Sequence, residues 1–340
     1  MKNPIFKGIG TALITPMTDD GRIDYAAIER LVQRQLDANI DALIVCATTG
    51  EAPTLADDEH IEIIRFVAQM AKGKTPIIAS TGSNYTDHAV EMSIKARDVG
   101  ADGLLCVTPY YNKCTQRGLL ESYTKIASAT ELPMIVYNVP GRTGVNIQPA
   151  TYEKLADNPK IVGIKEANGD ISSVVDTMTR CGHKIDMYSG NDDQIVPILS
   201  MGGIGCISVL SNLLPAETKQ ITEAWFAGDA AGAAKLQMKY KPLVDALFSE
   251  VNPIPAKAAL HAMGLCSDYA RLPLTPMEAG TRANLLKRME EVGIVLGFTN
   301  KNSRFLCGIG SLFVFITVRS CPQFWGRAAH RGCCPYRSDT

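Results

Sequence analysis

The sequence predicts an α/β protein: a (β/α)8 TIM barrel that is followed by a C-terminal helical segment. Eight short apolar runs succeed one another in the first 210 residues, and segments with helical periodicity separate them. The runs are continuously apolar rather than alternating, which is typical of parallel strands that are covered on both faces. Eight strand–helix units in succession close naturally into a barrel.

The predicted strands are rich in β-branched residues and cover 11–15, 41–47, 76–80, 103–108, 133–138, 161–165, 185–189 and 205–210. Helix signals lie between them. Asp24 can cap a helix that begins at Tyr25, acidic residues at 57–59 suit a first helical turn, and Thr86 precedes another helix. An open doubly wound sheet is the alternative. It is disfavoured because no Gly-x-Gly-x-x-Gly follows the first strand.

Beyond residue 225 the pattern changes to helices, predicted over 230–247, 255–263 and 276–291 with prolines at their boundaries. We therefore expect a barrel over 1–224 and a helical segment over 225–300. Residues 301–340 differ in composition: they hold six basic residues, one acidic residue and four cysteines. Their apolar run, 305–318, lacks clear periodicity and is shorter than the roughly 20 residues of a membrane-spanning helix. We interpret 301–340 as an atypical basic, Cys-rich tail outside the fold.

The overall composition is that of a globular enzyme, with 46% hydrophobic and 20% charged residues. A net charge of -1 offers no electrostatic attraction for nucleic acid or an anionic membrane. The first six residues lack the apolar stretch of a signal peptide, so we expect a cytoplasmic location. The six cysteines before residue 300 form no Cys-x-x-Cys pair, which favours core positions over disulfides or zinc ligands.

Lys165 is the most informative single residue. It is the only charged residue in the apolar run 161–165 and lies at its C-terminal end. Burial disfavours the charged form of a lysine, and the neutral amine can attack a ketone to form a Schiff base. A lysine with its head in solvent is the alternative, and for an isolated lysine it is the more common one.

Residues at the ends of three other predicted strands suit the same chemistry: 48–50 after 41–47, Tyr110 and Tyr111 after 103–108, and 137–144 at the end of 133–138. Strand ends of this kind carry the active sites of TIM barrels. Hydroxyls and backbone amides at Thr48, Thr49 and Gly50 can bind a carboxylate. Tyr137 can transfer protons, and Arg142 offers a planar fork for a second carboxylate. Each motif alone is also typical of a turn or of packing. Together with Lys165 they predict an enzyme that acts on an α-keto acid.

Other classes fit less well. The five histidines are dispersed and form no metal-ligand motif, so we expect no metal. A pyridoxal phosphate enzyme would need a phosphate-binding cup after strand seven or eight, and no such pattern is present, so we expect no cofactor. A non-catalytic barrel that binds keto acids stays open as an alternative, although it would not need the lysine, the tyrosine and the threonines together.

These motifs resemble those of the dihydrodipicolinate synthase family of class I Schiff-base aldolases and lyases, over residues 4–296. The resemblance rests on Thr-Thr-Gly-Glu at 48–51, Tyr-Asn-Val-Pro-Gly-Arg-Thr-Gly at 137–144 and Gly-Ile-Lys-Glu at 163–166. It implies a lyase that condenses pyruvate with L-aspartate 4-semialdehyde to 4-hydroxy-tetrahydrodipicolinate, in lysine and diaminopimelate biosynthesis. It also implies a homotetramer, built as a dimer of dimers, that requires no cofactor.

The resemblance implies a role for each matching residue. Lys165 resembles the Schiff-base lysine. Tyr137 resembles the proton donor and acceptor, linked through Thr48 to Tyr111 of a neighbouring subunit. The remaining implied roles are pyruvate-carboxylate binding by Thr49 with Gly50, semialdehyde-carboxylate binding by Arg142, and a backbone carbonyl of Ile207 that faces the site. Sugar-acid lyases such as N-acetylneuraminate lyase share the turn, the tyrosine and the lysine. They usually lack the Gly-Arg-Thr-Gly sequence, so Arg142 favours the synthase.

Some members of the family are inhibited by lysine in a cleft between subunits. The matching positions here are Pro53, Asp57, His60, Asn84, His88 and Tyr110. His60, Asn84 and Tyr110 fit the lysine-sensitive pattern. Asp57 replaces a histidine, and His88 replaces the glutamate that would contact the ammonium group of lysine. We therefore expect weak or absent inhibition.

Overall fold

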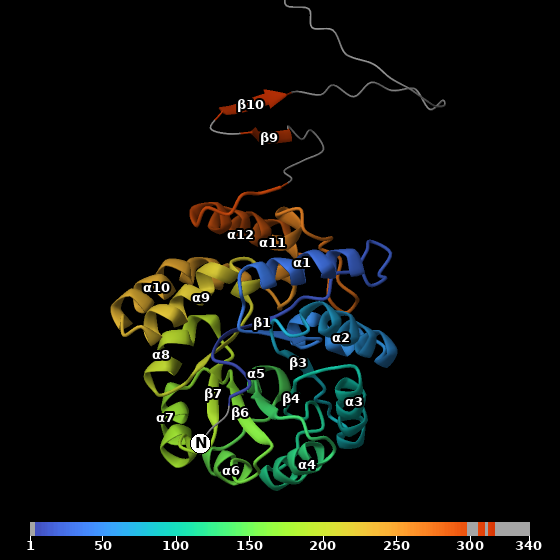
Figure 1. The fold of residues 1–340 in the computed structure, drawn as a ribbon, viewed down its shortest axis with the longest axis vertical. Coiled ribbons are helices and arrows are strands. Elements are labelled where there is room, and N and C mark those ends of the chain that lie inside the picture. The colour runs from blue at the N-terminus through green and yellow to red at the C-terminus, as the bar shows by residue number, and fades with distance from the viewer. Residues whose placement is uncertain (1–3, 298–304, 310–311, 317–340) are drawn as a thin grey trace, which may run out of the picture. The chain divides into compact units, whose positions relative to one another are not determined.

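The computed structural model describes residues 4–297, 305–309 and 312–316. Its centre is a closed barrel of eight parallel strands, each hydrogen-bonded to the next, with the eighth returning to the first (Figure 1). The strands are β1 Gly8–Ala12, β2 Ala42–Val45, β3 Ile77–Ser80, β4 Gly103–Val107, β5 Met134–Asn138, β6 Ile161–Glu166, β7 Asp186–Ser189 and β8 Gly205–Ser208. The predicted (β/α)8 fold is confirmed.

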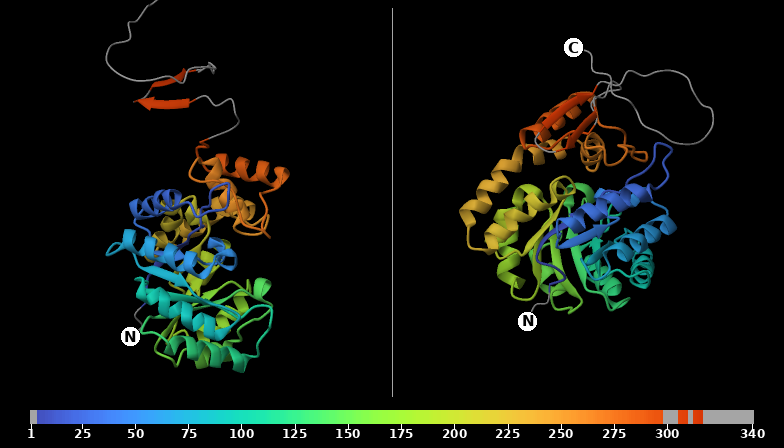
Figure 2. Two further views of the ribbon diagram at one scale, coloured as in Figure 1. Left: turned by 90° about the vertical axis from the view of Figure 1, so that its right-hand side faces the viewer. Right: turned by 45° about the horizontal axis from the view of Figure 1, so that its top comes forward.

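Helices surround the barrel (Figures 1 and 2). They are α1 Tyr25–Asp37, α2 Asp57–Ala71, α3 Thr86–Asp98, α4 Gln116–Ser128, α5 Pro140–Thr143, α6 Pro149–Leu155, α7 Ile171–Cys181, α8 Ile195–Ser200 and α9 Pro215–Phe226. Short 3-10 helices follow strand ends at η1 Thr48–Gly50, η2 Ala52–Thr54, η3 Asp192–Gln194 and η4 Leu210–Asn212. Asp24 caps α1 as predicted, because its side chain accepts a hydrogen bond from the Ala27 amide at 2.9 Å.

The first strand begins three residues earlier than predicted, at Gly8 rather than at residue 11. Its two glycines conceal it, because glycine is depleted in strands. Gly10 is required by close packing: a Cβ atom there would lie 2.5 Å from Ile44 Cδ1 and 2.9 Å from Phe6 Cζ. Phe6 in turn stacks on Tyr188, with the ring centroids 4.4 Å apart, and so fills the N-terminal end of the barrel.

The strands separate two layers of apolar packing. Side chains that point inward form one cluster, which includes Ile44, Ile135 and Ile207. Alternate side chains such as Leu43 and Val45 pack outward against the helices. Because both faces of the strands are buried, most of the strand sequences are apolar throughout, and this is the pattern that predicted a parallel barrel.

Three more helices follow: α10 Ala230–Leu247, α11 Ile254–Ala262 and α12 Ala279–Glu291. Helix α10 packs against α9, and α12 packs against α10 and α11. Helix α12 begins three residues later than predicted because Glu278 is extended and its amide donates to the Glu250 carboxylate at 3.1 Å. None of the described helices combines the length and the apolar character needed to cross a membrane.

The chain divides after Gly297 into two units. In the second unit, β9 Phe305–Ile309 and β10 Leu312–Ile316 form an antiparallel pair. The sequence analysis predicted no strand in the apolar run 305–318, and these ten residues form two. The strand pattern is hidden because the run is apolar at nearly every position. The remainder of the predicted tail, 301–340, lies outside the described residues.

Candidate active site

The C-terminal ends of the barrel strands open into a hollow of about 600 Å³. Thr48, Tyr137 and Arg142 line it, as predicted for residues at or beyond the C-terminal ends of β2 and β5. Lys165, Thr49 and Ile207 are not part of this lining. They are 4%, 3% and 1% exposed; Lys165 and Ile207 lie in β6 and β8, and Thr49 lies in η1 after β2.

Lys165 and Tyr137 are cross-strand partners on β6 and β5. The ammonium nitrogen of Lys165 lies 4.1 Å from the centroid of the Tyr137 ring. Gly190, after β7, provides the room: a Cβ atom there would lie 3.2 Å from Lys165 Cε and 2.8 Å from Ala167 Cβ. A buried lysine amine thus lies against a phenol that can exchange protons with it or with a bound substrate.

The turn after β2 is the 3-10 helix η1. Within it the Gly50 amide donates to the Ala47 carbonyl at 2.9 Å, and the Thr15 hydroxyl donates to the Gly50 carbonyl at 2.7 Å. The Gly50 amide is thus used inside the turn, so its contribution to carboxylate binding stays a prediction without support from this geometry. Glu51 ends the turn in the left-handed conformation, with φ at 56°.

Asn252 is a site residue that the sequence did not reveal. Its side-chain amide donates to the Thr49 hydroxyl oxygen at 2.9 Å, and its backbone carbonyl accepts from Arg142 Nη2 at 3.2 Å. With its oxygen accepting from Asn252, Thr49 can direct its own hydrogen toward a ligand. The Asn252 Oδ1 atom is buried and has no hydrogen-bond partner among the described residues.

Arg142 and Tyr111 are both exposed. Arg142 lies in α5, which ends at Gly144 with φ at 70°, and it lines the hollow. Tyr111 is 91% exposed and also has a positive φ of 70°. Within the described part of the chain, no hydrogen bond joins the hydroxyls of Thr48, Tyr137 and Tyr111. One chain therefore does not form the expected relay by itself.

All six residues predicted for an effector site line the same hollow: Pro53, Asp57, His60, Asn84, His88 and Tyr110. His88 Nε2 lies 3.0 Å from Asp57 Oδ1, so the two residues that depart from the lysine-sensitive pattern contact each other. His60 is buried, and its Nε2 lies 2.8 Å from the Ser80 carbonyl oxygen. Burial lowers the pKa of His60.

Two buried carboxylates, Asp192 and Glu166, form hydrogen bonds with residues at the C-terminal ends of the strands. Asp192 accepts hydrogen bonds from the Ser208 hydroxyl and the Val209 and Leu210 amides, and it thereby holds the chain after Ile207. Burial raises the pKa of Asp192, and these bonds oppose the shift. Glu166 follows Lys165, and burial raises its pKa to about 7, opposed by hydrogen bonds from its neighbours.

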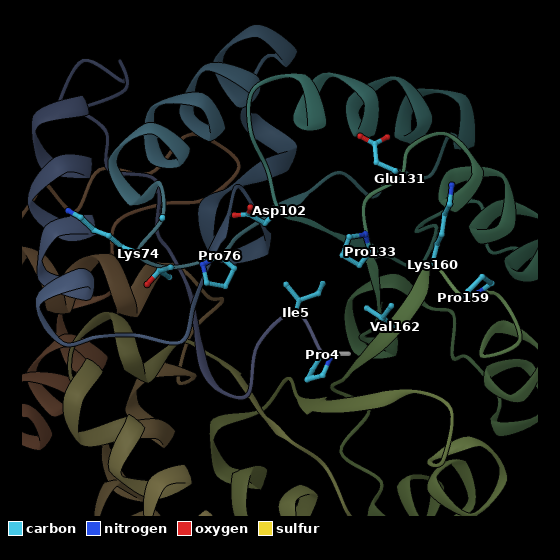
Figure 3. Close-up of a pocket in the computed structure, with 12 residues that line it drawn as sticks. Pro4, Ile5, Lys74, Pro76, Asp102, Glu131, Pro133, Pro159, Lys160 and Val162 are labelled. Carbon is cyan, nitrogen blue, oxygen red and sulfur yellow. The ribbon is translucent and has the colours of Figure 1, made fainter. Parts of the chain in front are cut away.

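A second hollow, of about 710 Å³, lies at the N-terminal end of the strands (Figure 3). Two of its charged side chains already have backbone partners: Lys160 donates to the Thr130 carbonyl at 2.6 Å, and Asp102 accepts from the Ile77 amide at 2.8 Å. In TIM barrels this end contributes stability rather than chemistry. We therefore take the hollow beside Tyr137 as the candidate active site, although it is the smaller of the two.

Metal ligands do not gather in the described ranges: no group of three His, Cys, Asp or Glu side chains there is close enough to hold an ion. Four of the six cysteines of the first unit, Cys46, Cys106, Cys181 and Cys206, are buried, in agreement with the core positions that the sequence favoured.

The model of the Dihydrodipicolinate synthetase family matches residues 5–292. The 4-hydroxy-tetrahydrodipicolinate synthase of Caldicellulosiruptor saccharolyticus is 53% identical over 291 residues, which are 86% of this chain and 98% of that protein. The dihydrodipicolinate synthase of Acinetobacter baumannii, solved with pyruvate, is 41% identical with a TM-score of 0.84 over 86% of this chain and 100% of its own. The enzyme of Cyanidioschyzon merolae, solved with lysine bound, is 38% identical with a TM-score of 0.84 over the same shares. The chain therefore belongs to the dihydrodipicolinate synthetase family.

Proposed function

We propose that this chain condenses pyruvate with L-aspartate 4-semialdehyde to 4-hydroxy-tetrahydrodipicolinate, the lyase reaction that serves lysine biosynthesis. The observation that carries the proposal is the buried Lys165 amine, 4.1 Å from the Tyr137 ring at the upper end of the barrel. The 53% identity to a 4-hydroxy-tetrahydrodipicolinate synthase supports the choice of this reaction over sugar-acid cleavage.

The first half of the reaction makes a nucleophile from pyruvate. The neutral Lys165 amine adds to the ketone carbon, and the carbinolamine loses water to give an imine. Loss of a proton from the methyl carbon then gives an enamine. Tyr137 is the group beside Lys165 that can deliver and remove these protons.

The second half forms the carbon–carbon bond. The enamine attacks the aldehyde of the semialdehyde, and the aldehyde oxygen takes up a proton to become the 4-hydroxyl group. The amino group of the former semialdehyde then attacks the imine carbon and displaces Lys165, which closes the ring and regenerates the enzyme. One water molecule leaves in the complete reaction, at the first imine.

The two substrate carboxylates need separate partners. Thr49, with its hydroxyl oxygen already bonded to Asn252, is oriented to donate to the carboxylate of pyruvate. Arg142, exposed at the mouth, is oriented by the Asn252 carbonyl and suits the carboxylate of the second substrate. Ile207, on β8, contributes its backbone carbonyl to the opposite wall.

The functional unit is an oligomer in which Tyr111 completes the relay of a neighbouring chain. In a single chain the Tyr111 side chain is 91% exposed to solvent, and its backbone has an unfavourable positive φ. Contact with a neighbouring chain would bury this aromatic ring. The family resemblance favours a tetramer built as a dimer of dimers.

Trapping with pyruvate and borohydride tests the chemistry. We expect one covalent adduct per chain, located by mass spectrometry on Lys165, and no adduct in Lys165→Arg, because arginine stays protonated and cannot attack a ketone. A coupled assay with pyruvate and aspartate semialdehyde then tests the reaction. An adduct without turnover of the semialdehyde would point to another pyruvate-dependent reaction, and trapping that persists in the arginine variant would remove Lys165 from the mechanism.

A further inference from the structure

Lys257 is a completely buried cation outside the residues assigned above. It lies in α11, its side chain is 0% exposed, and it donates to the Glu51 carboxylate and to the Tyr269 carbonyl, the latter at 2.7 Å. Burial lowers the pKa of Lys257, whereas the neighbouring Glu51 carboxylate favours its charged form. Burying even a paired charge carries a desolvation cost that the pairing often only offsets, so stability alone does not explain why this pair is buried.

Glu51 links that cation to the active site. Its backbone ends the turn that holds Thr48 and Thr49: its amide donates to the Thr48 carbonyl at 3.1 Å. Its left-handed φ of 56° is unfavourable for a residue with a side chain and is held by what surrounds it. The second carboxylate oxygen accepts from the Arg271 amide at 3.1 Å. The side chain is thus fixed from two segments that follow the barrel in the sequence.

We propose that Lys257 is a positioning residue that fixes the Thr48–Thr49–Gly50–Glu51 turn, and through it the groups that bind the carboxylate of pyruvate. Lys257 touches no substrate in this scheme. Its ammonium anchors Glu51, Glu51 sets the end of the turn, and the turn sets the Thr49 hydroxyl. The C-terminal helices are therefore part of the pyruvate-binding wall, an inference that rests on the proposed function.

Two variants separate positioning from stability. Lys257→Met keeps a long unbranched side chain but leaves the Glu51 carboxylate buried without its cation, so the variant is destabilised. The double variant Glu51→Gln/Lys257→Met removes both charges, while the glutamine oxygen can still accept from the Arg271 amide. We expect the melting temperature to recover largely in the double variant. The KM for pyruvate stays raised by about 10- to 100-fold in both variants, because a displaced turn misplaces Thr49.

Lys219→Met is the matched control. Lys219 forms a partly buried ion pair with Asp41, at 2.6 Å. Asp41 directly precedes β2, and the turn 48–51 follows β2. The control therefore breaks an ion pair at the opposite end of the same strand. It should lower the melting temperature and leave the KM for pyruvate unchanged.

All measurements use the full chain and include the extent of borohydride trapping at several pyruvate concentrations. A wild-type KM in the double variant overturns the inference, even if Lys257→Met is too unstable to purify. Absence of an adduct in the wild-type chain would instead refute the proposed function.

Discussion

Asn138 and Glu166 face each other across β5 and β6, one residue beyond Tyr137 and Lys165. The Asn138 amide donates to the Glu166 carboxylate at 2.9 Å and to Asn146 Oδ1 at 2.7 Å. Side chains alternate along a strand, so this pair lies behind the barrel wall while the reactive pair lies inside it. The Asn138–Glu166 hydrogen bond therefore joins β5 and β6 directly beside Tyr137 and Lys165.

Glu166→Gln should reduce kcat, because the carboxylate accepts from Tyr152, Asn138 and the Asn168 amide and a glutamine brings a donor into that set. We expect a loss of about 10- to 100-fold, typical of groups that orient a reactive residue. Tyr152→Phe, which removes one donor and leaves the carboxylate, should have a smaller effect. Wild-type kcat in Glu166→Gln would show that the strand pairing alone holds Lys165 and Tyr137.

The same carboxylate predicts a pH-dependent stability. Burial raises the pKa of Glu166 from 4.5 to about 7, so the folded state binds more protons than the unfolded state between these values. Its contribution to stability is therefore fully present below about pH 4.5 and is lost as the pH rises to about 7. Relative to Glu166→Gln, the wild type should lose of the order of 3 kcal/mol over this range. Denaturant unfolding of both proteins from pH 5 to 8 measures this loss of stability. Parallel stability profiles of the two proteins over that range would contradict the prediction.

Arg142 should discriminate between the substrates. Arg142→Ala should raise the KM for aspartate semialdehyde by about 10- to 100-fold, because one charge-assisted contact is lost. The KM for pyruvate should rise much less. Arg142→Lys should fall between, since lysine supplies the charge without the planar fork. Steady-state kinetics with each substrate varied would decide this. Equal effects on both substrates would place Arg142 at the pyruvate carboxylate instead.

The barrel was predictable because most strands are apolar on both faces, and Lys165 was conspicuous because it is the only charged residue in one of the predicted apolar runs. The partners of the catalytic turn were not predictable, since Asn252 and Lys257 lie 203 and 206 residues from the side chains that they contact. Lys257 nevertheless carried the signal that singled out Lys165: it interrupts the apolar run Ile254-Pro255-Ala256 to Leu260 in a buried helix. A pattern within one helix reveals a buried charge but not its distant partner.

Lysine should inhibit weakly. Asp57 and His88 line the hollow beside Tyr137, at the two positions where the lysine-sensitive pattern has a histidine and a glutamate. His88 Nε2 lies 3.0 Å from Asp57 Oδ1, so the two side chains pair with each other. The double variant Asp57→His/His88→Glu restores that pattern and a carboxylate for the ammonium of lysine. It should lower the inhibition constant by about 10- to 100-fold, equivalent to one charge-assisted bond. Calorimetry with lysine measures this. Tight binding by the unmodified chain would contradict the prediction.

Truncation after Asn300 should preserve activity. The residues proposed for the site end at Asn252, and the proposed positioning residue is Lys257. The last described core residue of the first unit is Ile294, and the Gly297 amide donates to the Ala262 carbonyl at 2.7 Å. The described strands of the second unit, β9 and β10, pair with each other. Both are apolar and lie in a segment with four cysteines, so removing it should also reduce aggregation and cross-linking. Thermal melts, light scattering and the coupled assay on both lengths compare the two forms. A lower melting temperature, a smaller oligomer or a lower kcat in the truncated chain would show that residues 301–340 belong to the working enzyme.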